Sequence, residues 1–204
     1  MWAKMVSAVI LAAGMSQRMK EAKLFLPFKK HTIIEEVIDH AKSSKVDEIY
    51  IVHGDDADRW RRIANNKGIL PIYNPNYKKG QSTSVKVGVE RISRNVEGVL
   101  FLLGDQPFIR SNIINGIIDT FHRRDRASII VPRYEGRRGN PVLFHLKWKN
   151  DLMSLTGDEG ARSILIKNHD EVGYIDFHNK FYNLDIDTKE DYKYALNLKE
   201  KVWE

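Results

Sequence analysis

Short apolar runs alternate along the chain with segments whose apolar residues recur every three or four positions. Residues 6–11 and 99–103 are almost entirely apolar, which is typical of strands buried on both faces of a sheet. Further strands are predicted at residues 48–52, 69–73, 128–131, 141–144, 172–175 and 182–186. Helical spacing predicts helices at residues 33–41, from 55–58 onward, and at 84–92, 111–121, 161–166 and 188–198.

This alternation predicts an α/β fold with a mainly parallel sheet covered by helices on both faces. Right-handed crossovers then place the carboxyl end of every strand at one edge of the sheet. We therefore expect the loops that follow Leu11 and Leu103 to converge there. The chain has no repeat, low-complexity segment or flexible linker, so residues 1–204 are predicted to form a single domain.

The loop after the first strand has a composition suited to phosphate binding. Ala12, Ala13 and Gly14 let a ligand approach the backbone, and Arg18 and Lys23 follow as cations. The loop matches neither G-x-x-x-x-G-K-[ST] nor G-x-G-x-x-G. Two alternatives are a secretory signal, which the short apolar run and the lack of cysteine oppose, and a plain turn with solvated cations.

Carboxylates follow two of the predicted strands. Asp105 lies in a turn after residues 99–103, where it is either a ligand for Mg²⁺ or a turn residue. Strand periodicity puts Asn183, Asp185 and Asp187 on one face of the strand predicted at 182–186. Asp187 also begins an Asp-x-x-Glu pattern, so it can cap the last helix, bind a metal, or do both.

Composition and charge narrow the function classes. The absence of cysteine excludes disulfides, thiolate metal sites and cysteine nucleophiles, and agrees with a cytoplasmic protein. No apolar run approaches the ~18 residues that a membrane span needs. The net charge of +6 favours an anionic partner such as a nucleic acid, a nucleotide or a phosphorylated metabolite. Arginines gather at residues 59–62, 123–126 and 133–138, and the first two groups fit solvated helix surfaces.

Two residue types argue against other sites. The seven histidines show no metal-ligand spacing. The tryptophans are scattered, without the paired aromatic platform that binding of single-stranded nucleic acid needs. We therefore expect no nucleic-acid partner.

Six motifs, in order, resemble those of the MobA-like nucleotidyltransferases, and among them the molybdenum cofactor cytidylyltransferases. The motifs are Leu11-Ala12-Ala13-Gly14 with Ser16, Arg18, Met19 and Lys23; Gly80, Ser84, Val85 and Gly88; Gly104 to Pro107; Arg138 to Phe144; Gly157 to Arg162; and Asp185 to Asp191. Three positions depart from the family pattern. Lys20 replaces a glycine, Asn140 replaces a histidine common in the cofactor enzymes, and Lys189 replaces a proline.

The resemblance implies a three-layer α/β/α, Rossmann-like fold of the nucleotide-diphospho-sugar transferase type. It also implies a reaction in which a phosphate oxygen of an acceptor attacks the α-phosphorus of a nucleoside triphosphate and pyrophosphate leaves. A phosphate monoester is already ionised at neutral pH, so this step needs no general base, and catalysis depends on positioning and charge neutralisation. The substrates implied are CTP and molybdopterin, with Mg²⁺ as cofactor.

The same resemblance assigns roles to residues. Arg18, Lys23 and Asp105 are the catalytic residues, and Asp105 and Asp187 hold the metal, with Asp185 behind them. The nucleotide-binding residues are Leu11, Ala12, Ala13, Gly14, Arg18, Lys23, Gly80 and Ser84. The acceptor is assigned to Arg138, Gly139 and Asn140. The Ala13 methyl group, where guanylyl-transferring relatives resemble L-A-G-G, favours CTP over GTP.

Other functions remain open at this point. The acceptor can be a sugar or polyol phosphate, or the chain can be a chaperone that delivers cofactor to a molybdenum hydroxylase. Intact Arg18, Lys23 and Asp105 favour an enzyme over a chaperone. A monomer without a membrane partner is expected.

Overall fold

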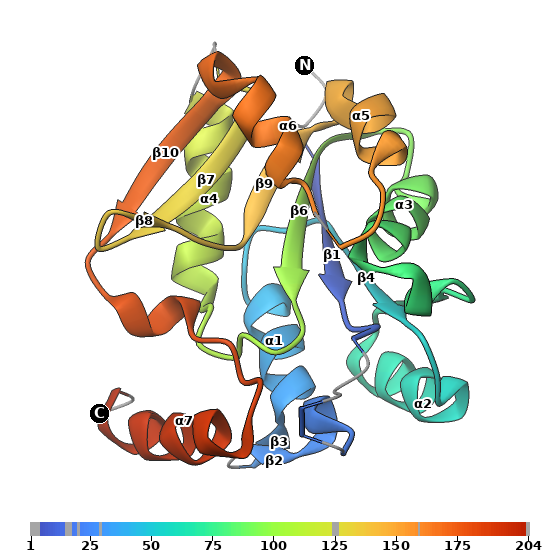
Figure 1. Cartoon of the computed structure of the whole chain (residues 1–204), viewed down its shortest axis with the longest axis vertical. Coiled ribbons are helices and arrows are strands. Elements are labelled where there is room, and N and C mark those ends of the chain that lie inside the picture. The colour runs from blue at the N-terminus through green and yellow to red at the C-terminus, as the bar shows by residue number, and fades with distance from the viewer. Residues whose placement is uncertain are drawn as a thin grey trace.

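One twisted sheet forms the centre of the molecule in the computed structural model, which describes residues 5–14, 18–19, 21–28, 30–123, 127–158 and 160–202 (Figure 1). The strand order is β10-β7-β9-β6-β1-β4-β5, with β8 paired to β7. The strands are β1 Met5–Leu11, β4 Glu48–His53, β5 Leu70–Tyr73, β6 Val96–Leu103, β7 Ile129–Tyr134, β8 Arg137–Arg138, β9 Val142–His145 and β10 Val172–Phe177. A separate two-stranded sheet joins β2 Pro27–Phe28 to β3 His31–Thr32.

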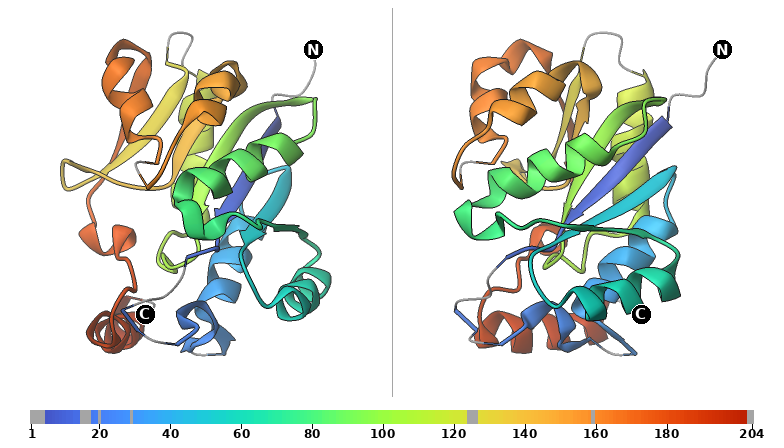
Figure 2. Two further views of the ribbon diagram at one scale, coloured as in Figure 1. Left: turned by 45° about the vertical axis from the view of Figure 1, so that its right-hand side comes forward. Right: turned by 90° about the vertical axis from the view of Figure 1, so that its right-hand side faces the viewer.

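Helices cover both faces of the sheet, as the two turned views show (Figure 2). The α-helices are α1 Ile33–Lys42, α2 Ala57–Lys67, α3 Gln81–Arg91, α4 Ser111–Arg123, α5 Lys149–Ser154, α6 Arg162–Lys167 and α7 Lys189–Val202. Short 3-10 helices are η1 Lys23–Phe25, η2 Tyr77–Lys79, η3 Leu146–Trp148, η4 His169–Glu171 and η5 Lys180–Asn183. The three-layer α/β/α architecture expected from the sequence is confirmed.

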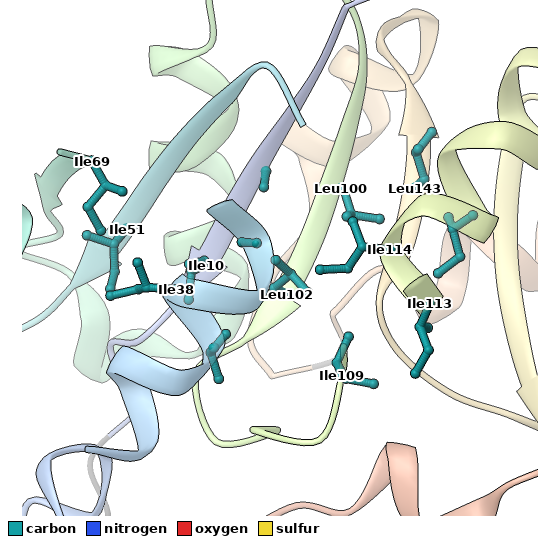
Figure 3. Packing of buried hydrophobic residues seen from close by; sticks show 14 of the residues in the cluster. Ile10, Ile38, Ile51, Ile69, Leu100, Leu102, Ile109, Ile113, Ile114 and Leu143 are labelled. Atoms are coloured by element: carbon teal, nitrogen blue, oxygen red, sulfur yellow. The ribbon is translucent and has the colours of Figure 1, made fainter. Parts of the chain in front are cut away.

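The alternation of side chains along β1 divides the core in two. Ile10 packs with α1, α2 and α4, together with Leu100 and Leu102 of β6 (Figure 3). Val9 points to the opposite face and packs with α3, α5 and α6. Gly88 of α3 permits this second contact, because a Cβ there would lie 2.6 Å from Cγ1 of Val9. The prediction that residues 6–11 form a strand buried on both faces is thus confirmed.

The solvated helix surface expected at residues 59–62 is also observed. Trp60 of α2 is buried against the core, whereas Arg61 and Arg62 of the same helix are exposed. Of the second arginine group, residues 124–126 lie outside the described part of the chain. None of the described helices is long and apolar enough to cross a membrane.

The strand directions correct one expectation. β1, β4, β5 and β6 are parallel, and β7 is parallel to β10, but β9 is antiparallel to both β6 and β7. The carboxyl end of β9 therefore does not meet the others. Parallel neighbours need a crossover of a dozen or more residues, and only residues 135–141 separate β7 from β9.

The strand predicted at residues 182–186 is wrong. Residues 180–183 form η5, and the following segment docks on the loop after β6, where the Ile186 amide donates to the Asp105 carbonyl at 3.1 Å. Leu184 and Ile186 pack with Phe28, Phe108 and α7, which lies beyond the carboxyl ends of β1 and β6 (Figure 1). The apolar alternation therefore reflects packing against α7, β2 and the loop after β6, not a strand.

Candidate active site

The loops after β1 and β6 meet, as expected. Leu11 and Leu103 are register partners at the ends of the two parallel strands, and the Gly104 amide donates to the Leu11 carbonyl at 3.0 Å. The Ala12 amide donates to the Val52 carbonyl of β4 at 2.8 Å. These bonds fix the backbone at the bottom of a cavity of about 520 Å³.

The cavity gathers all the residues assigned to the nucleotide and the metal. Its walls include Leu11, Ala12, Ala13, Gly14, Arg18, Lys23, Gly80, Ser84, Asp105 and Asp187. Sequence reasoning missed further lining residues, namely Leu24, Tyr77, Lys78, Gln81, Leu103 and Asp158. A signal for Asp158 existed, because it belongs to the motif at residues 157–162.

Lys23 is the buried centre of the charged part of the cavity. Its Nζ lies 2.7 Å from Asp105 Oδ2 and 2.8 Å from Asp187 Oδ1, and only 9% of its side chain is exposed. Burial alone would lower the pKa of Lys23, but the charge and hydrogen bond of Asp105, followed by those of Asp187, outweigh it and raise the pKa. Lys23 therefore stays protonated.

Arg18 extends this arrangement toward solvent. Its Nη1 lies 2.6 Å from Asp187 Oδ2, and 72% of its side chain is exposed. Asp105, Lys23, Asp187 and Arg18 thus form a continuous chain of ion pairs, here called the charged cluster. The cluster joins the loops after β1 and β6 to the segment that precedes α7.

Asp187 is not the cap of the last helix. Thr188 Oγ1 accepts from the Asp191 amide at 3.1 Å, and Asp191 Oδ2 accepts from the Thr188 amide at 2.8 Å. This is a capping box, so the start of α7 is satisfied by Thr188 and Asp191. The Asp187 carboxylate is left for Lys23 and Arg18.

Asp185 lies behind the charged cluster. Gln106 Nε2 donates to Asp185 Oδ1 at 2.7 Å. Loss of hydration, followed by the nearby charge of Asp105, raises the pKa of Asp185 to about 6. Asp185 therefore changes charge in the weakly acidic range.

The carboxylates of Asp105 and Asp187 suit Mg²⁺. Both offer hard oxygen ligands, and both contact Lys23 Nζ, so the two carboxylates are neighbours in the cavity. Within the described residues, no group of three or more His, Cys, Asp or Glu side chains is arranged to hold a metal. A site of two carboxylates completed by phosphate oxygens is the usual way in which Mg²⁺ binds nucleotides.

The other part of the cavity lies at the start of α3. Ser84 is buried there and accepts from Asn74 Nδ2 at 2.9 Å. The ring of Tyr77 covers the backbone of Gly54, where a Cβ would lie 2.4 Å from the Tyr77 Cγ. This wall combines an aromatic ring with polar groups.

The residues assigned to the acceptor form a turn that contacts Asn183. Arg138, Gly139 and Asn140, here called the 138–140 turn, are not among the residues that line the cavity. The Asn140 amide donates to Asn183 Oδ1 at 2.9 Å, and Tyr134 Oη donates to the Asn140 carbonyl at 2.6 Å. Arg138 is exposed. Binding of an acceptor by this turn stays a prediction, and Lys20, the departure in the first loop, lies outside the described residues.

Comparison with known proteins identifies the family. Residues 8–172 match the model of the MobA-like NTP transferase domain. The chain belongs to this family of nucleotidyltransferases. It is similar to the molybdenum cofactor cytidylyltransferase of Escherichia coli, with 29% identity over 98% of each chain. The resemblance inferred from the motifs is confirmed.

Solved structures agree with the family and the fold. Rv0371c from Mycobacterium tuberculosis superposes with a TM-score of 0.87 at 27% identity, covering 97% of this chain and 100% of that one. The complex of Rv0371C with manganese gives a TM-score of 0.78 at 26% identity, covering 95% and 98% of the two chains. The nucleotide-diphospho-sugar transferase fold expected from the sequence is therefore confirmed.

Proposed function

We propose that this chain transfers a cytidylyl group from CTP to the phosphate of molybdopterin and releases pyrophosphate, in a reaction that depends on Mg²⁺. The charged cluster carries this proposal, because it places two cations and two carboxylates in one cavity beside the loop Ala12–Gly14. The similarity to the Escherichia coli cytidylyltransferase supports the choice of nucleotide and acceptor.

Each member of the cluster has a role in this reaction. Lys23 and Arg18 bind oxygens of the triphosphate and neutralise the charge that shifts toward the leaving pyrophosphate. Asp105 and Asp187 would hold the metal, which would supply positive charge to the phosphates. The backbone of Ala13 and Gly14 lets the phosphates approach closely.

The chemical step needs little else from the protein. An acceptor phosphate oxygen forms a bond to the α-phosphorus, and the bond from that phosphorus to the bridging oxygen of pyrophosphate breaks. Because the attacking oxygen is already ionised, no side chain has to remove a proton. The protein contributes alignment and charge neutralisation.

The acceptor is the least constrained part of the proposal. We assign it to the 138–140 turn, and Asn140 stands where cofactor enzymes commonly have histidine. A sugar or polyol phosphate is therefore the second candidate, and delivery of cofactor to a molybdenum hydroxylase is the third. We further expect a cytoplasmic monomer.

Pyrophosphate release tests the proposal. The protein is incubated with Mg²⁺, each common nucleoside triphosphate and a panel of molybdopterin, sugar phosphates and polyol phosphates, and products are identified by mass spectrometry. Release that requires both CTP and molybdopterin is expected. If pyrophosphate is released with a sugar or polyol phosphate but not with molybdopterin, the acceptor is that sugar or polyol phosphate. If no pair of triphosphate and acceptor gives release, the assignment as a transferase is contradicted.

A further inference from the structure

The cavity has two chemically different ends. The charged cluster occupies one end, and the start of α3 forms the other with Tyr77, Lys78, Gln81 and Asp158. Since the cations of the cluster suit a triphosphate, the nucleoside of the same ligand has to extend toward α3. The groups at the start of α3 are therefore the ones that meet the base.

Asp158 is exposed, and one hydrogen bond of its own and one of its neighbour Gly157 connect this segment to the start of α3. Its Oδ1 accepts from the Gln81 amide at 3.0 Å, and the neighbouring Gly157 carbonyl accepts from the Ser82 amide at 3.1 Å. Gly80 makes room for this approach, since a Cβ there would lie 2.6 Å from the Gly157 carbonyl carbon and 2.8 Å from Asp158 Oδ1. The φ of Gly80 is also +111°, which side-chain-bearing residues rarely adopt.

The chemistry of Asp158 restricts what can lie beside it. An ionised carboxylate accepts hydrogen bonds and cannot donate them, so a base that meets it has to present an N–H group. Cytosine presents its 4-amino group, whereas uracil presents a carbonyl oxygen at the same position. Two acceptors facing each other leave a polar group unpaired, which weakens binding.

We propose that Asp158 is a specificity-determining residue that accepts a hydrogen bond from the 4-amino group of cytosine and so excludes UTP. This assignment rests on the proposed function of the cavity as a site for a nucleoside triphosphate. It adds to the selection by Ala13, because the Ala13 methyl group separates bases by size and Asp158 separates pyrimidines by their hydrogen-bonding pattern.

Calorimetric titration with CTP and with UTP, in Mg²⁺ and without acceptor, tests the assignment with no turnover. The wild-type protein is expected to bind CTP about ten- to a hundredfold more tightly than UTP, as for one hydrogen bond to a charged group. Asp158→Asn keeps an oxygen for the Gln81 amide and adds a donor that suits uracil. It should bring the two affinities within about threefold of each other.

Matched variants separate this role from others. Asp151→Asn removes an exposed carboxylate from α5, outside the cavity, and should keep the wild-type preference for CTP. Thermal melting checks that Asp158→Asn is folded; if it is not, Asp158→Ser, which also offers an oxygen to Gln81, is measured by the same ratio.

Three results would overturn the assignment. Equal affinities in the wild type, or an unchanged preference in the folded Asp158 variant, would remove Asp158 from base selection and leave the transferase proposal standing. Loss of the preference in Gln81→Ala, but not in the Asp158 variant, would transfer the role to Gln81. Failure of every triphosphate to bind would overturn the proposed function together with this inference.

Discussion

The charged cluster and the 138–140 turn are both assigned to substrates, but they are held in different ways. In the cluster, side chains hold one another through ion pairs around the buried Lys23. In the turn, backbone groups are held by Asn183 and Tyr134, and the Arg138 side chain is exposed. The cluster therefore presents paired charges around a buried ammonium, whereas the turn presents an exposed guanidinium on a backbone that hydrogen bonds fix.

The largest effect is expected from Asp105→Ala. It should lower turnover by more than ~10³-fold while the fold stays intact, because a strand-end carboxylate is lost from the metal site. The measurement is pyrophosphate release at ordinary Mg²⁺ concentration, with thermal melting as the check on folding. Near-normal turnover would show that Asp105 does not bind the metal. The charged cluster would then differ less from the 138–140 turn in its importance for the reaction.

Lys23→Ala and Arg18→Ala should each slow the reaction by ~10²- to 10³-fold, on the scale of one lost charge-stabilising donor. Lys23 should have the larger effect, because its ammonium is buried whereas Arg18 is screened by solvent. Both variants should also bind triphosphate more weakly in calorimetry. Unchanged affinity with less than about a threefold loss of rate would show that the phosphates bind elsewhere.

Ala13→Gly tests whether the cavity, and not the turn, selects the nucleotide. We expect the wild type to prefer CTP over GTP by about tenfold to a few hundredfold, the range for one misplaced methyl group. The variant should relax this preference with little loss of CTP use. The measurement is kcat/KM for both triphosphates, and equal use of GTP by the wild type would contradict the cytidylyl assignment.

Arg138→Ala should affect the acceptor alone. A rise of about two- to fivefold in KM for the acceptor is expected, since an exposed ionic contact contributes modestly. The affinity for CTP should stay unchanged, because Arg138 does not line the cavity. A parallel loss of CTP affinity would show that the 138–140 turn also contributes to nucleotide binding.

Asp185→Asn should give the smallest effect, and it concerns stability. The pKa of Asp185 is raised to about 6 in the folded chain, so folding favours the protonated form. Its favourable contribution is complete below about pH 4 and is lost as the pH rises through about 6. The neutral variant should therefore gain about 1 kcal/mol of unfolding free energy at pH 7 and nothing at pH 4, since partial exposure screens the charge. Denaturant unfolding at both pH values measures it.

Local patterns located Lys23 and Asp105 of the charged cluster, whereas Asp187 was assigned to the site by the family resemblance. Two buried runs end at Leu11 and Leu103, and adjacent parallel strands bring such ends together. The contribution of Asp158 to the cavity was not predicted in this way, because Asp158 lies in the loop between α5 and α6 and follows no strand that ends at the cavity. The same limit explains the wrong strand at 182–186, where apolar side chains alternate because they pack against α7.

The direction of β9 and the location of the 138–140 turn share another cause. The short connection between β7 and β9, residues 135–141, forces β9 to run against β7 and β6, and so places the turn at the amino end of β9, near the carboxyl end of β6. Periodicity predicts that a strand exists but not its direction, which depends on the length of the connection. The family motif at residues 138–144 was therefore recognisable, although its position relative to the cavity was not.

The capping box at the start of α7 has a practical consequence. Because Thr188 and Asp191 cap this helix end by themselves, Asp187 can be replaced without removing the cap of α7. Chemistry and folding are thus carried by neighbouring but separate side chains. A variant with a substitution at Asp187 alone should keep the fold but be unable to complete the transfer. Such a variant is therefore suited to crystallisation with both substrates bound.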